Sequence, residues 1–109
     1  MVPSMNTILK DWYIVSVFEG KELLGKILWG ICVDDMTYRF AIGDYVCTSK
    51  IEFISPMTHL IRTVNGSLYQ VIGEGRKVEV QVKDFELLRK GFSPDQITQL
   101  NLISHDLLH

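Results

Sequence analysis

Residues 12–18 read Trp-Tyr-Ile-Val-Ser-Val-Phe, a run that is almost wholly β-branched or aromatic. Seven such residues fit a strand covered on both faces better than a short helix. A polar turn follows at residues 19–22, and residues 27–33 then place large apolar side chains at every second position, which predicts a second strand. Gly30 inside that segment predicts a bulge, a sharp bend or a close backbone approach.

The segments that follow alternate between short apolar runs and turns. We expect strands at residues 38–41, 45–48, 51–54 and 78–82. The clearest local signal is the pair Asn65-Gly66 between the apolar runs 59–64 and 67–72. Because Asn-Gly tolerates the positive φ angles of a type I′ turn, the sequence predicts a β-hairpin there.

The apolar period changes to that of a helix after residue 83. Asp84 is placed to cap a short helix that ends at Gly91. Residues 93–96 read Ser-Pro-Asp-Gln, which supplies a capping serine, a proline at the first helical position and the glutamine of a capping box. The second helix carries an apolar stripe made of Ile97, Leu100, Ile103 and Leu107.

These elements predict an α+β fold. We expect a strongly bent antiparallel sheet or a small, partly open β-barrel of about six to seven strands, with one or two C-terminal helices. An open sheet with helices on one face is the rival arrangement. The 109 residues fit one domain (1–109), with an N-terminal extension at 1–10, a mainly β part at 11–83 and a helical C-terminus at 84–109.

The composition places the chain among globular proteins, because 47% of its residues are hydrophobic and 22% are charged. A formal net charge of -2 gives no overall field that attracts phosphate backbones. The first residues lack the pattern of a secretory signal and no apolar run is long enough for a bilayer, so we expect a cytoplasmic protein with no membrane contact. In a reducing compartment Cys32 and Cys47 are interpreted as small core hydrophobes.

One segment, residues 39–49, concentrates hydrogen-bonding groups between apolar strands. Two interpretations stay open, and the first is favoured: Arg39 and Asp44 form a structural ion pair around a turn. In the second, a small polar pocket is lined by Arg39, Asp44, Tyr45, Thr48 and Ser49.

Other groupings do not indicate chemistry. His105 and His109 have a helical four-residue spacing, but we interpret them as solvated tail residues rather than metal ligands. The adjacent Ser104-His105-Asp106 cannot chain nucleophile, base and orienting acid. We therefore assign no catalytic, metal or cofactor-binding residue and expect no cofactor.

A basic edge is a further candidate feature, made of Arg76, Lys77, Lys83, Arg89 and Lys90. Together with exposed aromatic side chains of a small barrel, such an edge could bind nucleic acid by charge and base stacking. Interleaved acids such as Glu79 and Glu86 cancel most of its field, so nucleic acid stays a weaker alternative partner.

A family resemblance rests on short motifs in the same region. They are Arg39-Phe40, Gly43-Asp44-Tyr45-Val46, Thr48-Ser49 and Gly66-Ser67-Leu68-Tyr69 with Val71, Gly73 and Gly75. Over roughly residues 11–100 the chain resembles a group of short proteins encoded in bacterial integron gene cassettes, particularly those of marine bacteria. The resemblance implies a cytoplasmic bacterial accessory protein of a mobile element, and it implies no activity or catalytic residues.

The sequence favours a non-enzymatic binding or accessory module that self-associates, with a dimer as the first expectation and a protein partner as a further one, because the chain is apolar for its size. The expected interface is the C-terminal helix stripe or an edge near Trp12 and Trp29. Two alternatives stay open: a nucleic-acid-binding small barrel, and a small hydrolase or ribonuclease-like toxin that uses Arg39 with an acid such as Asp44.

Overall fold

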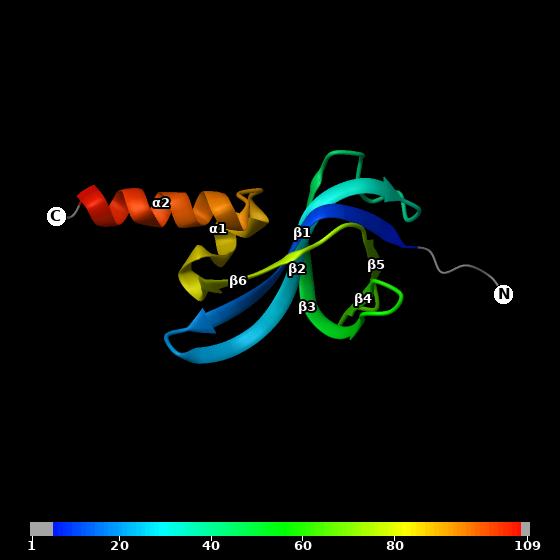
Figure 1. The fold of residues 1–109 in the computed structure, drawn as a ribbon, viewed down its shortest axis with the longest axis horizontal. Helices are drawn as coiled ribbons and strands as arrows, with labels where there is room; N and C mark the ends of the chain where they lie inside the picture. The colour runs from blue at the N-terminus through cyan, green and yellow to red at the C-terminus, as the bar shows by residue number, and fades with distance from the viewer. Residues whose placement is uncertain (1–5, 108–109) are drawn as a thin grey trace.

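The computed structural model describes residues 6–107, and the side chains of residues 6–103. Six strands precede a short 3₁₀ helix and two α-helices (Figure 1). The strands are β1 (Thr7–Glu19), β2 (Glu22–Asp35), β3 (Tyr45–Ser55), β4 (Leu60–Thr63), β5 (Leu68–Val71) and β6 (Arg76–Gln81). The helices are η1 (Val82–Asp84), α1 (Phe85–Arg89) and α2 (Pro94–Leu107).

The long strand β1 organises the sheet. One edge pairs antiparallel with β2 along nearly its whole length, while the other edge pairs parallel with β5 over residues 7–9 and then parallel with β6 over residues 13–18. The change of neighbour falls at an irregularity between Lys10 and Tyr13, where Asp11 has a φ of 48°. A bulge of this kind bends a strand and increases its twist, so the two halves of β1 serve two different parts of the fold.

The first half of β1 closes a ring of hydrogen bonds through β1, β2, β3, β4, β5 and back to β1. The side chains buried in this part are Leu9, Leu28, Cys32, Val46, Ile61, Tyr69 and Val71. Gly30 lies against this cluster, because a Cβ added there would meet the Leu9 Cβ at 3.2 Å and the Lys10 carbonyl oxygen at 3.3 Å. The close approach expected at Gly30 is therefore confirmed.

The second half of β1 packs with β2 and β6 under the helices. The side chains of this second core are Tyr13, Val15, Val17, Ile27, Trp29, Val80, Leu88 and Ile97. Because Leu88 comes from α1 and Ile97 from α2, the helices complete a core that the strands alone leave uncovered.

The predicted α+β class, the strongly bent sheet and the C-terminal helices are confirmed. The sheet is mixed rather than antiparallel, because β1 is parallel to both β5 and β6. Residues 7–10, expected in an N-terminal extension, belong to β1, with Thr7 and Leu9 fully buried. Residues 45–55 form one strand, β3, instead of the two short ones expected, which lets it pair with β2 at its start and β4 at its end.

The predicted hairpin at Asn65-Gly66 is confirmed as the connection between β4 and β5, but its turn is not type I′. Only Gly66 has a positive φ, 87°, whereas type I′ needs positive angles at two consecutive residues. The Gly66 amide donates to the Thr63 carbonyl (2.9 Å) and the Thr63 amide donates to the Ser67 carbonyl (3.1 Å). This is a three-residue loop with glycine at the left-handed position.

The sequence predicted an N-terminal cap for both α1 and α2, and the two predictions had different outcomes. The capping box of α2 is confirmed: the Gln96 amide donates to Ser93 Oγ (3.2 Å) and the Ser93 amide donates to Gln96 Oε1 (2.8 Å). Asp84 precedes α1 as expected, but its side chain makes no capping hydrogen bond. Its carboxylate instead accepts a hydrogen bond from the Asn101 side-chain amide of α2 (3.1 Å).

Candidate interaction surface

The first half of α2 is fixed to the domain by its packing. Ile97 is 2% exposed and Pro94 is fully buried. The hydrogen bond between Asn101 and Asp84 ties the next turn of α2 to the start of α1. Burial of Ile97 is the largest of these contributions, since a fully buried isoleucine side chain is worth about 1.5–3 kcal/mol.

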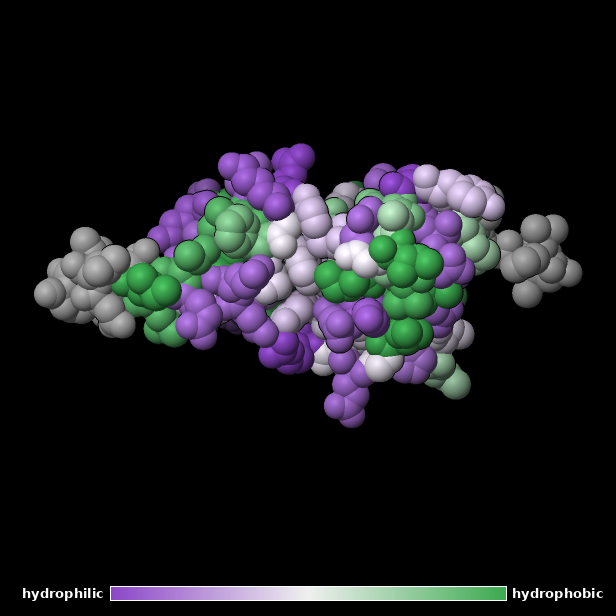
Figure 2. All heavy atoms as spheres, turned by 90° about the horizontal axis from the view of Figure 1, so that it is seen from above, coloured by the Kyte–Doolittle hydropathy of each residue, from purple (hydrophilic) through white to green (hydrophobic). Residues whose placement is uncertain are grey.

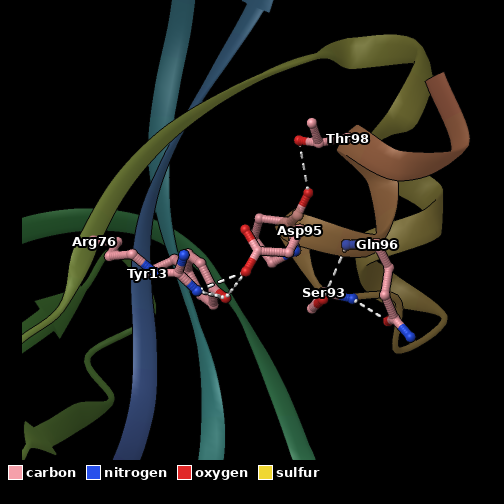
Figure 3. Close-up of polar contacts among 7 residues, drawn as sticks. Tyr13, Arg76, Ser93, Asp95, Gln96 and Thr98 are labelled. Carbon is pink, nitrogen blue, oxygen red and sulfur yellow. Dashed lines mark hydrogen bonds and ion pairs between the residues drawn. The ribbon is translucent and has the colours of Figure 1, made fainter. Parts of the chain in front are cut away.

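A polar cluster of Tyr13, Arg76 and Asp95 adds direction to this attachment (Figure 3). The Tyr13 hydroxyl donates to Asp95 Oδ2 (2.9 Å), and Arg76 Nη2 donates to the same oxygen (2.6 Å) and to the Tyr13 hydroxyl. The Arg76 guanidinium also lies 4.6 Å from the centroid of the Tyr13 ring. Because these residues come from β1, β6 and α2, the cluster sets where α2 begins relative to the sheet.

The electrostatics of this cluster are those of an anchor. The hydrogen bond from Arg76, followed by that from Tyr13, lowers the pKa of Asp95, so the carboxylate is charged at neutral pH. Burial, with the nearby Asp95, raises the pKa of Tyr13, so its hydroxyl keeps its proton. The Arg76 and Asp95 side chains are each more than half exposed, so solvent screens the ion pair and its net contribution to stability is small.

The second half of α2 leaves the body of the domain. In Figure 1 this helix runs away from the strands. Three of its apolar side chains, Leu100, Leu102 and Ile103, are 40%, 55% and 54% exposed. Leu100 and Ile103 share one face of the helix, while Leu102 lies about 100° round the helix axis from Ile103. We call these three residues the α2 apolar surface; Figure 2 shows hydrophobic side chains gathered at this end of the molecule. Since residues 96–103 include no charged residue, the surface is neutral as well as apolar.

The predicted interface is only partly placed at the surface. Of the expected stripe, Leu100 and Ile103 are exposed, Ile97 is buried, and the Leu107 side chain lies outside the described residues. The alternative edge near Trp12 and Trp29 is not available, because Trp29 is 4% exposed and packs between Tyr13 and Tyr45 in the core.

Trp12 has a structural task of its own. Its ring nitrogen donates to the carbonyl oxygens of Ile72 (3.1 Å) and Gly73 (3.3 Å), which links β1 to the turn between β5 and β6. Its ring lies so close to Gly75 that an added Cβ would sit 2.4 Å away. The indole therefore depends on glycine at that position.

The residues of the candidate polar pocket do not converge on one place. Asp44 and Tyr45 line a hollow of about 600 Å³ together with Phe40, Cys47 and Arg89. Thr48 and Ser49 line a different hollow beside β2. Arg39 lines neither, since its guanidinium donates to Thr37 Oγ1 (2.9 Å) and Ser67 Oγ (3.3 Å).

The favoured ion pair between Arg39 and Asp44 is absent among the described side chains. Asp44 instead accepts a hydrogen bond from the Ala41 amide (2.9 Å), a local turn contact. The Tyr45 hydroxyl donates to the Arg89 carbonyl (2.6 Å), so it holds the end of α1 against β3. These groups stabilise loops and helix ends rather than face a common substrate.

The organising acid of this region is Asp35, the last residue of β2. Its carboxylate accepts hydrogen bonds from the Thr7 hydroxyl (2.9 Å), from both the amide and the hydroxyl of Thr37 (2.9 and 2.5 Å), and from the amides of Arg39 and Phe40 (2.6 and 2.8 Å). Burial raises the pKa of Asp35, but these hydrogen bonds outweigh it and hold the pKa well below its usual range.

This network explains why the strand predicted at residues 38–41 is wrong. The segment forms bends and turns instead, and Tyr38 has a φ of 59°. The backbone amides of residues 37, 39 and 40 donate to the Asp35 side chain, so they are satisfied without a neighbouring strand.

The basic edge is divided by ion pairs. Arg76 bonds to Asp95, and Arg89 Nη1 lies 3.3 Å from Glu86 Oε1. Lys77 lies in β6 and Lys83 in η1. Each arginine of the expected edge therefore already has a carboxylate partner, which opposes a role in holding phosphates.

The interpretation of both cysteines as core residues is confirmed. Cys32 is 1% exposed and Cys47 is partly buried against the second core, and the two thiols are free. Burial raises the pKa of Cys47 to about 11, so its thiol is neutral at physiological pH.

No cluster of three or more histidine, cysteine or acidic side chains that could hold a metal occurs among the described residues. Two groupings considered in the sequence lie outside the described side chains: the histidine pair His105 and His109, and the run Ser104-His105-Asp106. Within the described part of the chain, no helix has the length and hydrophobicity to cross a bilayer.

Comparison with known proteins gave no match to a family model, to a curated protein or to a solved structure. The resemblance to integron cassette proteins therefore stays a prediction. The class that the fold itself defines is an α+β domain with a six-stranded mixed sheet and a projecting C-terminal helix.

Proposed function

We propose that this domain is a non-enzymatic interaction module that self-associates, with α2 as its contact element. The observation that carries the proposal is the α2 apolar surface: Leu100, Leu102 and Ile103 are about half exposed on a helix whose first half is firmly anchored. A partner that covered this surface would bury side chains that the domain leaves in water.

The length of α2 supports the same conclusion. Fourteen residues correspond to a helix of about 21 Å, and isolated helices of this length are marginal in water. Only the first half gains stability from packing against the domain. Contact with a second molecule would supply the missing tertiary packing to the second half.

The other two hypotheses find less support in the geometry. A catalytic role for Arg39 with Asp44 would need their side chains to meet, and each is bonded to a different loop group. A nucleic-acid role would need basic side chains free to hold phosphates, and both arginines of the basic edge are bonded to acids, which leaves that task to Lys77, Lys83 and Lys90. The first arrangement does not match what catalysis requires, and the second offers fewer phosphate-binding groups than the sequence suggested.

The size of the contact can be bounded. Burying the exposed half of a leucine or isoleucine side chain gives about 1 kcal/mol, and Leu100 and Ile103 are the two that share a helix face, so two such residues from each of two copies give about 4 kcal/mol. Association costs at least about 4 kcal/mol in lost freedom. The α2 apolar surface alone thus supports only weak pairing, and a stable dimer needs apolar surface from elsewhere in the domain.

The proposal is tested by sedimentation equilibrium at micromolar concentration. We expect the wild-type domain to form a dimer and Ile103→Glu to be a monomer with an unchanged circular dichroism spectrum. Ile42→Glu is the matched control, because Ile42 is 80% exposed and lies in the loop between β2 and β3; it should dimerise like the wild type. A wild-type domain that stays monomeric over this range refutes self-association.

A further inference from the structure

An unfilled apolar hollow of about 280 Å³ lies beside the β1–β2 hairpin. Its lining comes from both strands of the hairpin, from β3 and from the η1–α1 segment: Val17, Leu24, Gly25, Ile27, Thr48, Ser49, Lys50, Val82 and Phe85. We call it the hairpin groove. Leu24 is 43% and Val82 39% exposed, so its walls are apolar surface in contact with water.

Resting on the proposed self-association, we propose that α2 of a second copy docks in the hairpin groove, and that the contact is reciprocal. Each copy would give its α2 apolar surface to the other and receive the other's helix in return. The reason is that each copy has a projecting apolar helix and an apolar hollow, and pairing them covers both at once.

The apolar area argument favours this arrangement over helix-to-helix pairing. Two α2 helices facing one another bury about two partly exposed side chains from each copy, Leu100 and Ile103, which is little for a stable dimer. Docking in the groove adds Leu24 and Val82 of the receiving copy, and the two-fold repeat doubles that addition.

The charges do not oppose this docking. The groove lining carries one charged side chain, Lys50, whose aliphatic carbons lie along Gly25, about 3.1–3.3 Å from where a Cβ would be. The described side chains of α2 after Asp95 are uncharged, so docking takes no charged side chain of this part of the helix out of water.

The placement of the two features suits exchange between copies. In Figure 1 the η1–α1 segment lies between α2 and the β1–β2 hairpin, and the residues that line the groove include none from α2 of the same copy. The start of α2 is held in that position by Ile97 and Asp95. Helix and groove nonetheless belong to the same end of the molecule, so one two-fold axis at that end can form both contacts and close the assembly.

Cross-linking between singly substituted proteins tests the docking directly. Leu24→Cys and Ile103→Cys are prepared separately, mixed under mild oxidation and examined by non-reducing gel and mass spectrometry. We expect the mixture to give a disulfide-linked heterodimer faster than either variant alone gives a homodimer, while Ile42→Cys mixed with either variant gives none. Preferential homodimers of Ile103→Cys would show that α2 pairs with α2 and would overturn the docking.

A second variant separates this inference from the proposed function. Leu24→Glu changes an exposed wall of the groove and leaves α2 intact, so it should weaken dimerisation by about tenfold or more in sedimentation equilibrium. If Leu24→Glu dimerises as tightly as the wild type while Ile103→Glu does not, self-association through α2 stands and the groove is refuted as its receptor. A monomeric wild type refutes both.

Discussion

Replacing Asp35 by asparagine should be among the most damaging conservative substitutions in this domain. The change keeps the shape of the side chain but turns one carboxylate oxygen into an NH₂ group. In the better of its two orientations, the amide oxygen still accepts from Thr7 and Thr37, while the NH₂ group faces the amides of Arg39 and Phe40. The two backbone amides then face a donor instead of an acceptor, and the hydrogen bonds from Thr7 and Thr37 go to a neutral oxygen instead of a charged one.

The magnitude follows from these contacts. A hydrogen bond to a charged group contributes about 1.5–3 kcal/mol, and a neutral one about 1 kcal/mol. Thr7 is fully buried, so its hydroxyl cannot bond to solvent in place of Asp35, whereas the amides of Arg39 and Phe40 can. Counting the weakened bonds at Thr7 and Thr37 with about 1 kcal/mol for the loop gives a loss of about 3 kcal/mol in the free energy of unfolding. This is a large fraction of the stability of a small domain.

The assay is urea unfolding followed by tryptophan fluorescence at a series of pH values. Because the pKa of Asp35 is lower in the folded protein than its ordinary value of 3.8, its contribution is complete above that value and is lost as the pH falls through the folded pKa. The Asp35→Asn variant should lack this part of the acid sensitivity. Asp34→Asn is the control, because the asparagine oxygen can still accept the Asp35 amide. A variant within about 0.5 kcal/mol of the wild type at neutral pH would refute the reasoning.

Three further predictions concern other contacts. Tyr13→Phe removes the hydroxyl bonded to Asp95 and should lower the free energy of unfolding by about 1 kcal/mol in thermal melts; no change would show that packing alone anchors α2. Gly75→Ala brings a Cβ to within 2.4 Å of the Trp12 ring and should cost about 1–3 kcal/mol in urea unfolding, with a shifted tryptophan emission; an unperturbed spectrum would contradict the close contact. Cys47, with a thiol pKa of about 11, should be alkylated by iodoacetamide at neutral pH far more slowly in the native than in the unfolded protein, as followed by mass spectrometry; equal rates would mean that the thiol is accessible.

The features that the sequence predicted correctly are coded within a few residues. The Ser93 and Gln96 side chains need only the local helix start to meet, and Gly66 marks a turn between two apolar runs. The two-residue period of an apolar run indicates a strand, but it does not say which strand lies beside it. The parallel neighbours of β1 therefore could not be read from the pattern.

Long-range polar contacts explain most of what the sequence did not reveal. Asp35 is joined to Thr7 across the β1–β2 pairing, and no spacing within residues 34–37 indicates that contact. The Arg39–Asp44 pair failed for a related reason, since each side chain found a closer partner in its own loop. The expected interface was partly wrong because a large apolar residue in the sequence can lie either at the surface or in the core. Ile103 is exposed to solvent, whereas Trp29 is buried in the core.

The dual pairing of β1 also has a consequence for the order of assembly. Its first half pairs with β5 and its second half with β6, and both of these strands come much later in the chain. Neither core can therefore close until most of the domain has been synthesised. Contacts between segments distant in sequence slow folding, because the chain loses the entropy of the closing loop before the stabilising contacts have formed. On the ribosome, the β1–β2 hairpin must therefore wait with the outer edge of β1 unpaired, while β2 can pair with β3 as soon as that next strand is made, so the edge of β1 is the part that most needs protection from premature association.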